Sequence, residues 1–383
     1  MPPAIFMPAP EPKTPLGRHR ILSPHAGVRV SPLQLGAMSI GGAWSEFMGT
    51  MDKESSFKLL DAFVEAGGNF IDTANNYQDE ESETFLGEWM TERKNRDRIV
   101  LATKFTTNYR AYADGKNESI NNSGNHKKSL QLSLRDSLKK LQTDYVDILY
   151  LHWWDWTTSI EEVMHSLDIL VKQGKVLYLG ISDTPAWIVS AANTYARDHG
   201  LTPFVIYQGR WSLLDRSFER DIIPMARQFG LALAPWGAMA QGRLQSKKQL
   251  EERKKNGERF RTLRGGPEQT DEEERFSTLL SKIAAEHNIE SVTAIALAYV
   301  LSKTPYVFPI VGGRKVEHLH DNIQALSIKL TAEQIREIED AKDFQPGFPH
   351  DMIGGDSSLA GVDQAFLVKA SGTLDFVKGS APL

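Results

Sequence analysis

The chain has 383 residues, of which 41% are hydrophobic and 24% are charged, a composition typical of a folded protein with a substantial core. Its formal net charge of -5 gives no electrostatic reason to expect nucleic acid or an anionic membrane as a partner. The sequence contains no cysteine, which excludes disulfides, thiolate metal ligands and a cysteine nucleophile.

The N-terminal segment is rich in proline and lacks the basic start and apolar run of a signal peptide. We therefore expect an extended arm over residues 1–16 and a cytoplasmic location. No stretch approaches the roughly 18 consecutive apolar residues of a membrane span. Residues 20–21 and 28–30 flank a turn around Ala26-Gly27, which predicts a β-hairpin suited to plugging the base of a barrel.

Short apolar runs then alternate with longer amphipathic segments, and we interpret these runs as buried strands of a parallel sheet. Eight strands are expected, at residues 33–35, 69–72, 99–104, 148–152, 176–180, 204–208, 231–235 and 307–311. Helical spacing is clearest in two groups, Phe57, Leu60, Phe63 and Val64, then Leu130, Leu134, Leu138 and Leu141.

Eight strand–helix repeats predict the α/β class and a single (β/α)8 TIM barrel. The runner-up architecture is a doubly wound sheet that binds a dinucleotide. That fold would normally show G-x-G-x-x-G after its first strand, and the pattern is absent there.

Two segments interrupt the repeats, a polar insertion at residues 237–275 and an extended C-terminal tail at residues 344–383. We thus predict a barrel domain over residues 17–343 that includes the insertion. The insertion is rich in basic side chains, namely Lys247, Lys248, Arg253, Lys254, Lys255, Arg259, Arg261 and Arg264. Two interpretations stay open, a solvated helix of mixed charge and a flap over an anionic cofactor.

Ionisable side chains end three consecutive predicted strands, Asp72, Lys104 and His152. The C-terminal ends of barrel strands form the active-site face, so these side chains should meet on one rim, with Tyr77 close by. Each alone has an ordinary explanation, as a helix cap, an exposed lysine or a packed histidine, but their matching positions favour a shared site.

A phenol has a pKa of about 10 and is a poor proton donor at neutral pH. The Lys104 ammonium is expected to lower the pKa of Tyr77, and Asp72 to hold that lysine charged. Such a phenol can protonate a carbonyl oxygen while hydride arrives at the carbon.

The run D-T-A-N-N-Y, together with the strand-ending Lys104 and His152, resembles the aldo-keto reductase superfamily over residues 17–330. The resemblance implies a (β/α)8 barrel and a nicotinamide cofactor bound without a Rossmann domain. It implies that Tyr77 is the general acid, that Asp72 and Lys104 tune it, and that His152 orients the substrate carbonyl.

The resemblance also implies a cofactor site on the same face. Ser182, Asp183 and Gln208 would hold the nicotinamide carboxamide, although family members mostly have asparagine where this chain has Asp183, and a carboxylate cannot donate. Trp236 is a candidate for stacking on the nicotinamide, with a place in the barrel wall or in the substrate pocket as the alternative. The complete set of cofactor candidates is Gly36, Met38, Ser182, Asp183, Gln208, Trp236, Gly313, Arg314, Lys315, His318 and Asn322.

The segment P-I-V-G-G-R-K-V-E-H-L-H-D-N after the eighth strand resembles the family's site for the adenosine 2′-phosphate and adenine. Arg314 and Lys315 supply positive charge beside a predicted helix N-terminus, which favours NADPH/NADP+ over NADH. The histidines show no metal-ligand spacing, so no metal is expected.

Closer similarity is seen to fungal aryl-alcohol dehydrogenases and norsolorinic acid reductase-type enzymes, in runs such as KLQTDYVDILYLHWWDW and YQGRWS. It implies reversible, NADPH-dependent reduction of aromatic aldehydes, small molecules with a carbonyl group. Candidate pocket residues, with ordinary packing as the alternative, are Trp44, Met48, Trp153, Trp154 and Trp211. Two other functions stay open, reduction of a larger polyketide-like aromatic ketone and a non-enzymatic, NADPH-binding regulatory subunit.

Overall fold

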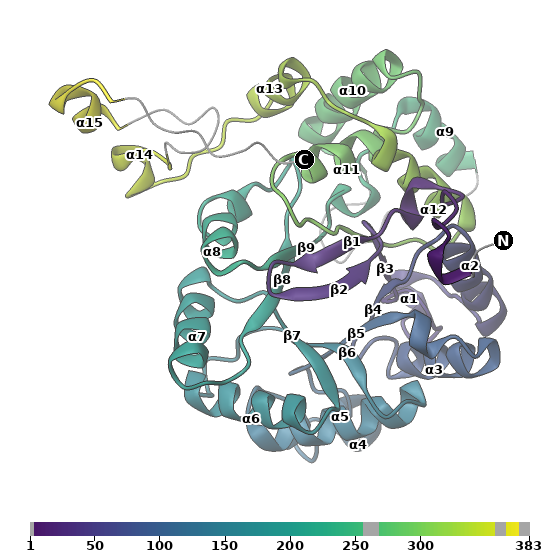
Figure 1. Cartoon of the computed structure of the whole chain (residues 1–383). Helices are drawn as coiled ribbons and strands as arrows, with labels where there is room; N and C mark the ends of the chain where they lie inside the picture. The colour runs from purple at the N-terminus through teal and green to yellow at the C-terminus, as the bar shows by residue number, and fades with distance from the viewer. Residues whose placement is uncertain (1–3, 256–267, 357–364, 375–383) are drawn as a thin grey trace.

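The computed structural model describes residues 4–255, 268–356 and 365–374 (Figure 1). Its centre is a sheet of eight parallel strands in the order β10-β3-β4-β5-β6-β7-β8-β9. The strands are β3 (Gln34–Gly36), β4 (Phe70–Asp72), β5 (Val100–Phe105), β6 (Val146–Leu151), β7 (Val176–Ser182), β8 (Phe204–Arg210), β9 (Ala232–Trp236) and β10 (Ile310–Val311).

The sheet closes where β9 meets the chain just before β10. Leu233 N donates to Tyr306 O at 2.9 Å, and Phe308 N donates to Leu233 O at 2.8 Å. A parallel bridge pairs Leu233 with Val307. The predicted (β/α)8 barrel is therefore confirmed, and the predicted strand limits differ from the observed ones by at most three residues.

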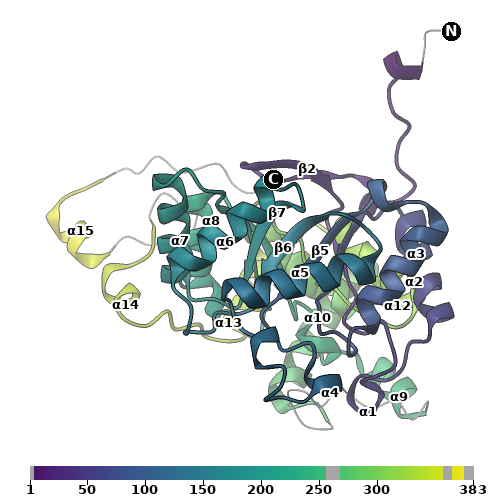
Figure 2. The same ribbon diagram turned by 90° about the horizontal axis from the view of Figure 1, so that it is seen from below.

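A helix follows each barrel strand and lies outside the sheet (Figures 1 and 2). These helices are α2 (Lys53–Glu65), α3 (Glu81–Arg93), α5 (Lys127–Leu141), α6 (Ile160–Lys172), α7 (Ala186–Asp198), α8 (Ile222–Phe229), α11 (Val292–Ser302) and α12 (Val316–Ile323). The apolar spacing predicted for α2 and α5 is confirmed, because Phe57, Leu60, Phe63, Leu130 and Leu134 are buried. None of the helices in the described ranges is long and apolar enough to cross a membrane.

The N-terminal hairpin consists of β1 (Arg20–Ser23) and β2 (Ala26–Val30), paired antiparallel. Its turn lies at Pro24-His25, so the predicted turn at Ala26-Gly27 is wrong. Proline lacks the N–H that a strand ladder needs, which makes Pro24 the better turn residue.

The hairpin closes the base of the barrel. Leu22, Ala26 and Val30 are buried in the same cluster as Phe70 and Phe308, which lie inside the barrel near the N-terminal ends of its strands. Figure 1 shows the two purple strands lying across one end of the barrel. Only the opposite end of the barrel is therefore left uncovered by the hairpin.

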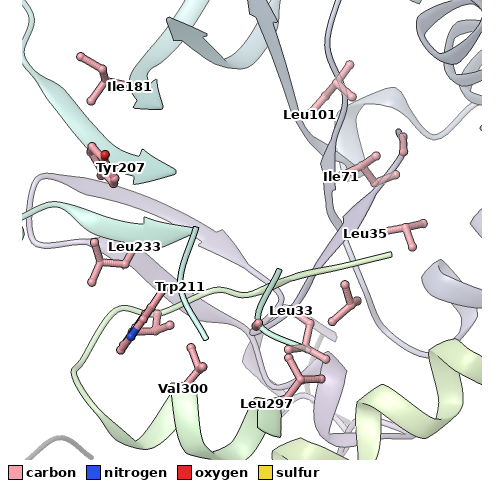
Figure 3. Packing of buried hydrophobic residues seen from close by; sticks show 14 of the residues in the cluster. Leu33, Leu35, Ile71, Leu101, Ile181, Tyr207, Trp211, Leu233, Leu297 and Val300 are labelled. Atoms are coloured by element: carbon pink, nitrogen blue, oxygen red, sulfur yellow. The ribbon is translucent and has the colours of Figure 1, made fainter. Parts of the chain in front are cut away.

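Side chains alternate between the two faces of each strand. Ile71 and Leu101 point outward to the helices, as Figure 3 shows together with Leu35 on the neighbouring strand. Phe70 and Ala102, one residue away in each strand, belong to the interior cluster. The alternation decides which polar residues at the strand ends face the barrel axis.

The predicted insertion contains α9 (Lys247–Lys255), and α10 (Asp271–Glu286) begins before its predicted end. A capping box starts α10, in which Thr270 accepts from Glu273 N and the Glu273 side chain accepts from Thr270 N. The basic residues Arg259, Arg261 and Arg264 lie outside the described residues.

Both ends of the described chain extend from the barrel. The N-terminal segment projects away in Figure 2, yet Leu16 is buried and Thr14 Oγ1 donates to Ala66 O at 2.6 Å. At the other end, α13 (Ala332–Asp340) packs on α10. The short helix α14 (His350–Ile353) contacts the start of α8, because His350 Nε2 lies 3.3 Å from Asp221 Oδ1, and α15 (Phe366–Ser371) lies farther from the barrel (Figure 1).

Gly87 marks a close approach between α3 and α5. A Cβ at this position would lie 2.1 Å from the Lys140 carbonyl oxygen. We expect Gly87→Ala to lower the free energy of unfolding by about 1–3 kcal/mol, although alanine is the better helix former. Urea denaturation measures this, with Gly27→Ala as the control, because a Cβ at Gly27 meets no atom within 4 Å. Equal unfolding midpoints for Gly87→Ala and the wild type would contradict the close approach.

Candidate active site

The structure brings Asp72, Lys104 and His152 together at the open end of the barrel. Asp72 ends β4, Lys104 is the penultimate residue of β5, and His152 directly follows β6. Two positions before each of them lies a residue of the barrel interior, namely Phe70, Ala102 and Tyr150, respectively. Residues two positions apart in a strand point to the same face. Their side chains therefore point to the barrel axis near the C-terminal ends of the strands.

Lys104 is completely buried and is held by oxygen atoms. Its Nζ lies 2.6 Å from Asp72 Oδ2, 2.6 Å from Thr73 O and 3.4 Å from the Tyr77 hydroxyl. Burial lowers the pKa of Lys104, but the effects of Asp72 and Tyr77 together outweigh burial, and the net pKa is raised. Lys104 is therefore a fixed positive charge beside the phenol.

Tyr77 lies in the turn between β4 and α3, with its ring over the Lys104 ammonium at 4.9 Å. Burial raises the pKa of Tyr77, and the opposing effect of the Lys104 charge is smaller. The expected lowering of this pKa is wrong for the chain alone, because the energy needed to bury a phenolate exceeds the attraction of one ammonium. Tyr77 is consequently a neutral phenol with a proton to donate.

His152 packs edge-on against Tyr77, with ring centroids 5.8 Å apart at 78°. Burial, followed by the Lys104 charge, holds the pKa of His152 well below its ordinary value. The imidazole is therefore neutral near pH 7 and has a single N–H to donate. Its buried Nδ1 has no hydrogen-bond partner among the residues that the structure describes.

A cavity of about 770 Å³ opens at this end of the barrel. Asp72, Tyr77 and His152 line it, and Lys104 stands behind them. Every predicted cofactor residue lines the same cavity, namely Gly36, Met38, Ser182, Asp183, Gln208, Trp236, Gly313, Arg314, Lys315, His318 and Asn322.

The inner end of the cavity is polar and fits a nicotinamide carboxamide. Ser182 Oγ is buried and has no hydrogen-bond partner within the described ranges, so it is suited to a bound polar group. Gln208 Nε2 donates to Asp72 Oδ1 at 2.8 Å, which turns the amide toward the tetrad formed by Asp72, Tyr77, Lys104 and His152. Trp236 Nε1 donates to Asp183 Oδ1 at 3.2 Å, which fixes the indole at the cavity wall.

The outer end of the cavity is cationic. Gly313, Arg314 and Lys315 precede α12, whose N-cap is Lys315. A Cβ at Gly49 would lie only 1.5 Å from Arg314 Nη1, and Gly49 has φ +73°. The guanidinium therefore rests against the loop between β3 and α2, at the edge of the cavity, where an anionic group could meet both the helix N-terminus and the side chain.

None of the five predicted pocket residues lines this cavity. Trp211 is fully buried, stacks on Phe218 with centroids 5.3 Å apart, and belongs to the core, as does Trp154. The pocket assignment of these two rings lacks support, because they fill space between the barrel and its helices.

The other three candidates lie nearer the rim. Trp44 is closest to the tetrad, edge-on to Tyr77 at 6.3 Å with its Nε1 donating to Asp79. Trp153 is partly exposed and donates to Thr107 Oγ1 at 3.0 Å, and Met48 is buried in α1 (Ser45–Met48).

Sequence reasoning missed several cavity residues. They come from the loop before α2 and the start of α2, from the first part of the insertion, from α11, from β10 and the residue after it, and from α12. These residues are Ser39, Thr50, Met51, Ser55, Gly237, Ala238, Met239, Gln241, Gly242, Gln249, Thr293, Ile310, Gly312 and Asp321. The position of residues 237–242, directly after a barrel strand, was a usable signal. The start of the insertion thus forms part of the cavity wall.

Comparison with known proteins agrees with this geometry. Residues 32–343 match the Aldo/keto reductase family. A Saccharomyces cerevisiae protein that carries an aryl-alcohol dehydrogenase name is 65% identical over 93% of this chain and 94% of its own. Aryl-alcohol dehydrogenase [NADP(+)] of Phanerodontia chrysosporium is 53% identical over 97% and 96%. Norsolorinic acid reductase A of Aspergillus parasiticus is 54% identical over 90% and 86%. The chain belongs to the aldo-keto reductase family and is an oxidoreductase that acts on carbonyl and alcohol groups.

Proposed function

We propose that this protein reduces aromatic aldehydes to alcohols with NADPH, reversibly, with Tyr77 as general acid. Members of the family generally use NAD(P)H. The observation that carries the proposal is one continuous cavity, which joins Tyr77 and His152 at its inner end to Arg314 and Lys315 at its outer end. A carbonyl compound and a phosphate-bearing cofactor would share that space.

The bound cofactor would supply hydride to the carbonyl carbon. Tyr77 then donates its proton to the carbonyl oxygen, and the fixed Lys104 charge, 3.4 Å away, stabilises the phenolate that remains. Neutral His152 donates one hydrogen bond that orients the carbonyl oxygen toward Tyr77. Asp72 keeps Lys104 charged and in place, and alcohol oxidation runs the same steps in reverse.

The aromatic substrate class has two supports. Two relatives are named for aryl-alcohol dehydrogenase and norsolorinic acid reductase activity. In addition, Trp44 packs edge-on against the Tyr77 ring just outside the cavity, so an aromatic group already lies at the edge of the proposed site. A panel of purified protein, NADPH and aldehydes, followed by loss of NADPH absorbance, tests this. Faster turnover of aliphatic than of aromatic aldehydes would contradict the aromatic assignment.

Reduction of a larger aromatic ketone is the second candidate, favoured by the norsolorinic acid reductase relative. The same panel distinguishes it, because a ketone with several fused rings would then have a higher kcat/KM than benzaldehyde.

Arg314 and Lys315 are proposed to select NADPH over NADH. A charge-assisted hydrogen bond to a phosphate contributes about 1.5–3 kcal/mol, so replacing both residues by leucine and methionine should raise the Kd for NADPH tenfold or more. The Kd for NADH should change little, since NADH lacks the 2′-phosphate. Fluorescence titration measures both constants, with the exposed Lys58→Met as the control. Equal weakening of both cofactors would exclude a 2′-phosphate contact.

A further inference from the structure

Three consecutive residues after Tyr77 have left-handed backbone conformations. Their φ angles are +52° for Gln78, +49° for Asp79 and +79° for Glu80, and none of them is glycine. Such conformations are unfavourable for residues with a Cβ and persist only when surrounding contacts hold them. The turn that follows Tyr77 is therefore strained, and contacts with surrounding residues must stabilise it.

The first two residues are fixed by the loop between β3 and α2. Gln78 Nε2 donates to Met38 O at 2.9 Å, and Gln78 Oε1 accepts from Trp44 N at 2.8 Å. Asp79 Oδ1 accepts from Trp44 Nε1 at 2.9 Å. These contacts hold the turn on the side of the cavity.

The third residue, Glu80, is fixed from the opposite side by two cations. Its Oε1 accepts from Arg110 Nη1 at 3.1 Å and from the Tyr112 hydroxyl at 3.0 Å. Its Oε2 lies 2.8 Å from Lys140 Nζ. Lys140 is the penultimate residue of α5, which the short distance between Gly87 and the Lys140 backbone holds tightly against α3.

Lys140 contacts the chain on both sides of Tyr77. Besides Glu80, its Nζ donates to Asn75 O at 3.0 Å and pairs with Glu83 Oε2 at 2.8 Å. The lysine side chain is only 12% exposed, so the three oxygens largely replace water around the ammonium. Burial lowers the pKa of Lys140, but Glu83 and Glu80 outweigh burial, and the net pKa is raised.

The same cluster touches the strand that carries Lys104. Glu83 Oε1 accepts from Thr103 Oγ1 at 2.5 Å, and Thr103 directly precedes Lys104 in β5. One buried ammonium thus connects Asn75, Glu80 and, through Glu83, the strand of the lysine next to the phenol. Lys140 itself does not line the cavity.

We propose that Lys140 is a positioning residue, which fixes the backbone before and after Tyr77 and thereby sets the Tyr77 hydroxyl against Lys104 and His152. This inference rests on the proposed role of Tyr77 as proton donor. It adds a group outside the cavity on which the rate of proton transfer depends, because a displacement of about 1 Å at a reacting group can lower a rate about 100-fold.

Lys140→Met tests the proposal, and Arg96→Met is its matched control. Arg96 is also a buried cation, with its side chain 15% exposed, and it bonds Asp147, Ile99 O and Tyr145 O at the base of the barrel. Both variants should lose stability in urea. We expect kcat of Lys140→Met to fall at least about tenfold with the Kd for NADPH changed less than about threefold, and kcat of Arg96→Met to stay within about twofold of the wild type. Similar losses of kcat in both variants would show a structural role only and overturn the proposal.

A second measurement does not depend on turnover. In protein with ¹³C-labelled tyrosine, the Tyr77 resonance is the one missing from Tyr77→Phe. It should shift in Lys140→Met and keep its position in Arg96→Met. If the wild type reduces no carbonyl compound, the proposed function fails, yet this resonance still decides whether Lys140 positions Tyr77.

Lys140→Arg keeps the proposal testable if the methionine variant does not fold. A planar guanidinium keeps the charge but cannot hold the same three oxygens in the same arrangement. We expect this variant to fold, to shift the Tyr77 resonance and to have a kcat between those of Lys140→Met and the wild type. A wild-type kcat together with an unmoved resonance would overturn the proposal.

Discussion

The Tyr77→Phe variant is expected to bind NADPH as the wild type does and to lose turnover by about 10²–10⁴-fold. The phenylalanine ring fills the same space against Trp44 and His152, so the fold and the cavity should persist. The variant lacks the hydroxyl proton of Tyr77, and we expect no neighbouring side chain to supply a proton in its place. His152 is neutral because burial holds its pKa well below the ordinary value, and Lys104 is held charged by Asp72.

Single-turnover measurements of NADPH oxidation, with cofactor binding followed by fluorescence, would test this expectation. Tyr195→Phe is the matched control. The Tyr195 hydroxyl contacts His165 on the outer helices, and Tyr195 does not line the cavity. Turnover by Tyr77→Phe at the rate of Tyr195→Phe would remove the phenol from the mechanism.

Lys104→Met is expected to lower the free energy of unfolding by about 3–5 kcal/mol and to abolish most turnover. The substitution leaves the Asp72 carboxylate, which is 3% exposed, with the Gln208 amide but without its cation. It also removes the charge that would stabilise the Tyr77 phenolate. Urea unfolding gives the stability, and NADPH oxidation gives the rate.

The double variant Asp72→Asn with Lys104→Met separates these two effects. It removes both buried charges, so it should be more stable than Lys104→Met while remaining inactive. Lys282→Met serves as the control for an exposed ion pair, with Glu337, and should cost less than about 1 kcal/mol. A double variant less stable than Lys104→Met would contradict the uncompensated charge as the cause.

Strand parity is the reason that so much of the fold and of the tetrad could be predicted. The side chain of a residue at the end of a barrel strand points either to the barrel axis or to the surrounding helices. Asp72 therefore shares the direction of Phe70, and Lys104 that of Ala102, as the interior cluster shows. Position along the strand then brings them to the same end.

Burial depth was not predictable in the same way. Trp211 and Trp44 both occur in rim loops, yet Trp211 packs on Phe218 in the core, whereas Trp44 contacts Tyr77. The local sequence around each ring is compatible with either place. The raised pKa of Tyr77 was not predicted, for the same reason. The free-energy cost of burying the ionised phenol depends on the surrounding packing, and not on the neighbouring residues that the sequence motif identifies.

Lys140 shows a third limit. In the sequence it follows Lys139 near the end of an amphipathic helix, where lysines are usually solvated and interact with the helix C-terminus. Only the packing of α5 against α3 brings it to Glu80 and Glu83. Its partners come from another part of the chain, and no spacing within α5 predicts them.

The hairpin at the base of the barrel has a kinetic consequence. Because β1 and β2 seal that end, the carbonyl compound and the cofactor must exchange with solvent through the same mouth. The nicotinamide candidates Ser182 and Gln208 lie at the inner end of the cavity, so the cofactor must settle before a carbonyl can lie between it and Tyr77. We therefore expect compulsory-order kinetics, in which the cofactor binds before the carbonyl compound and the alcohol departs before the oxidised cofactor.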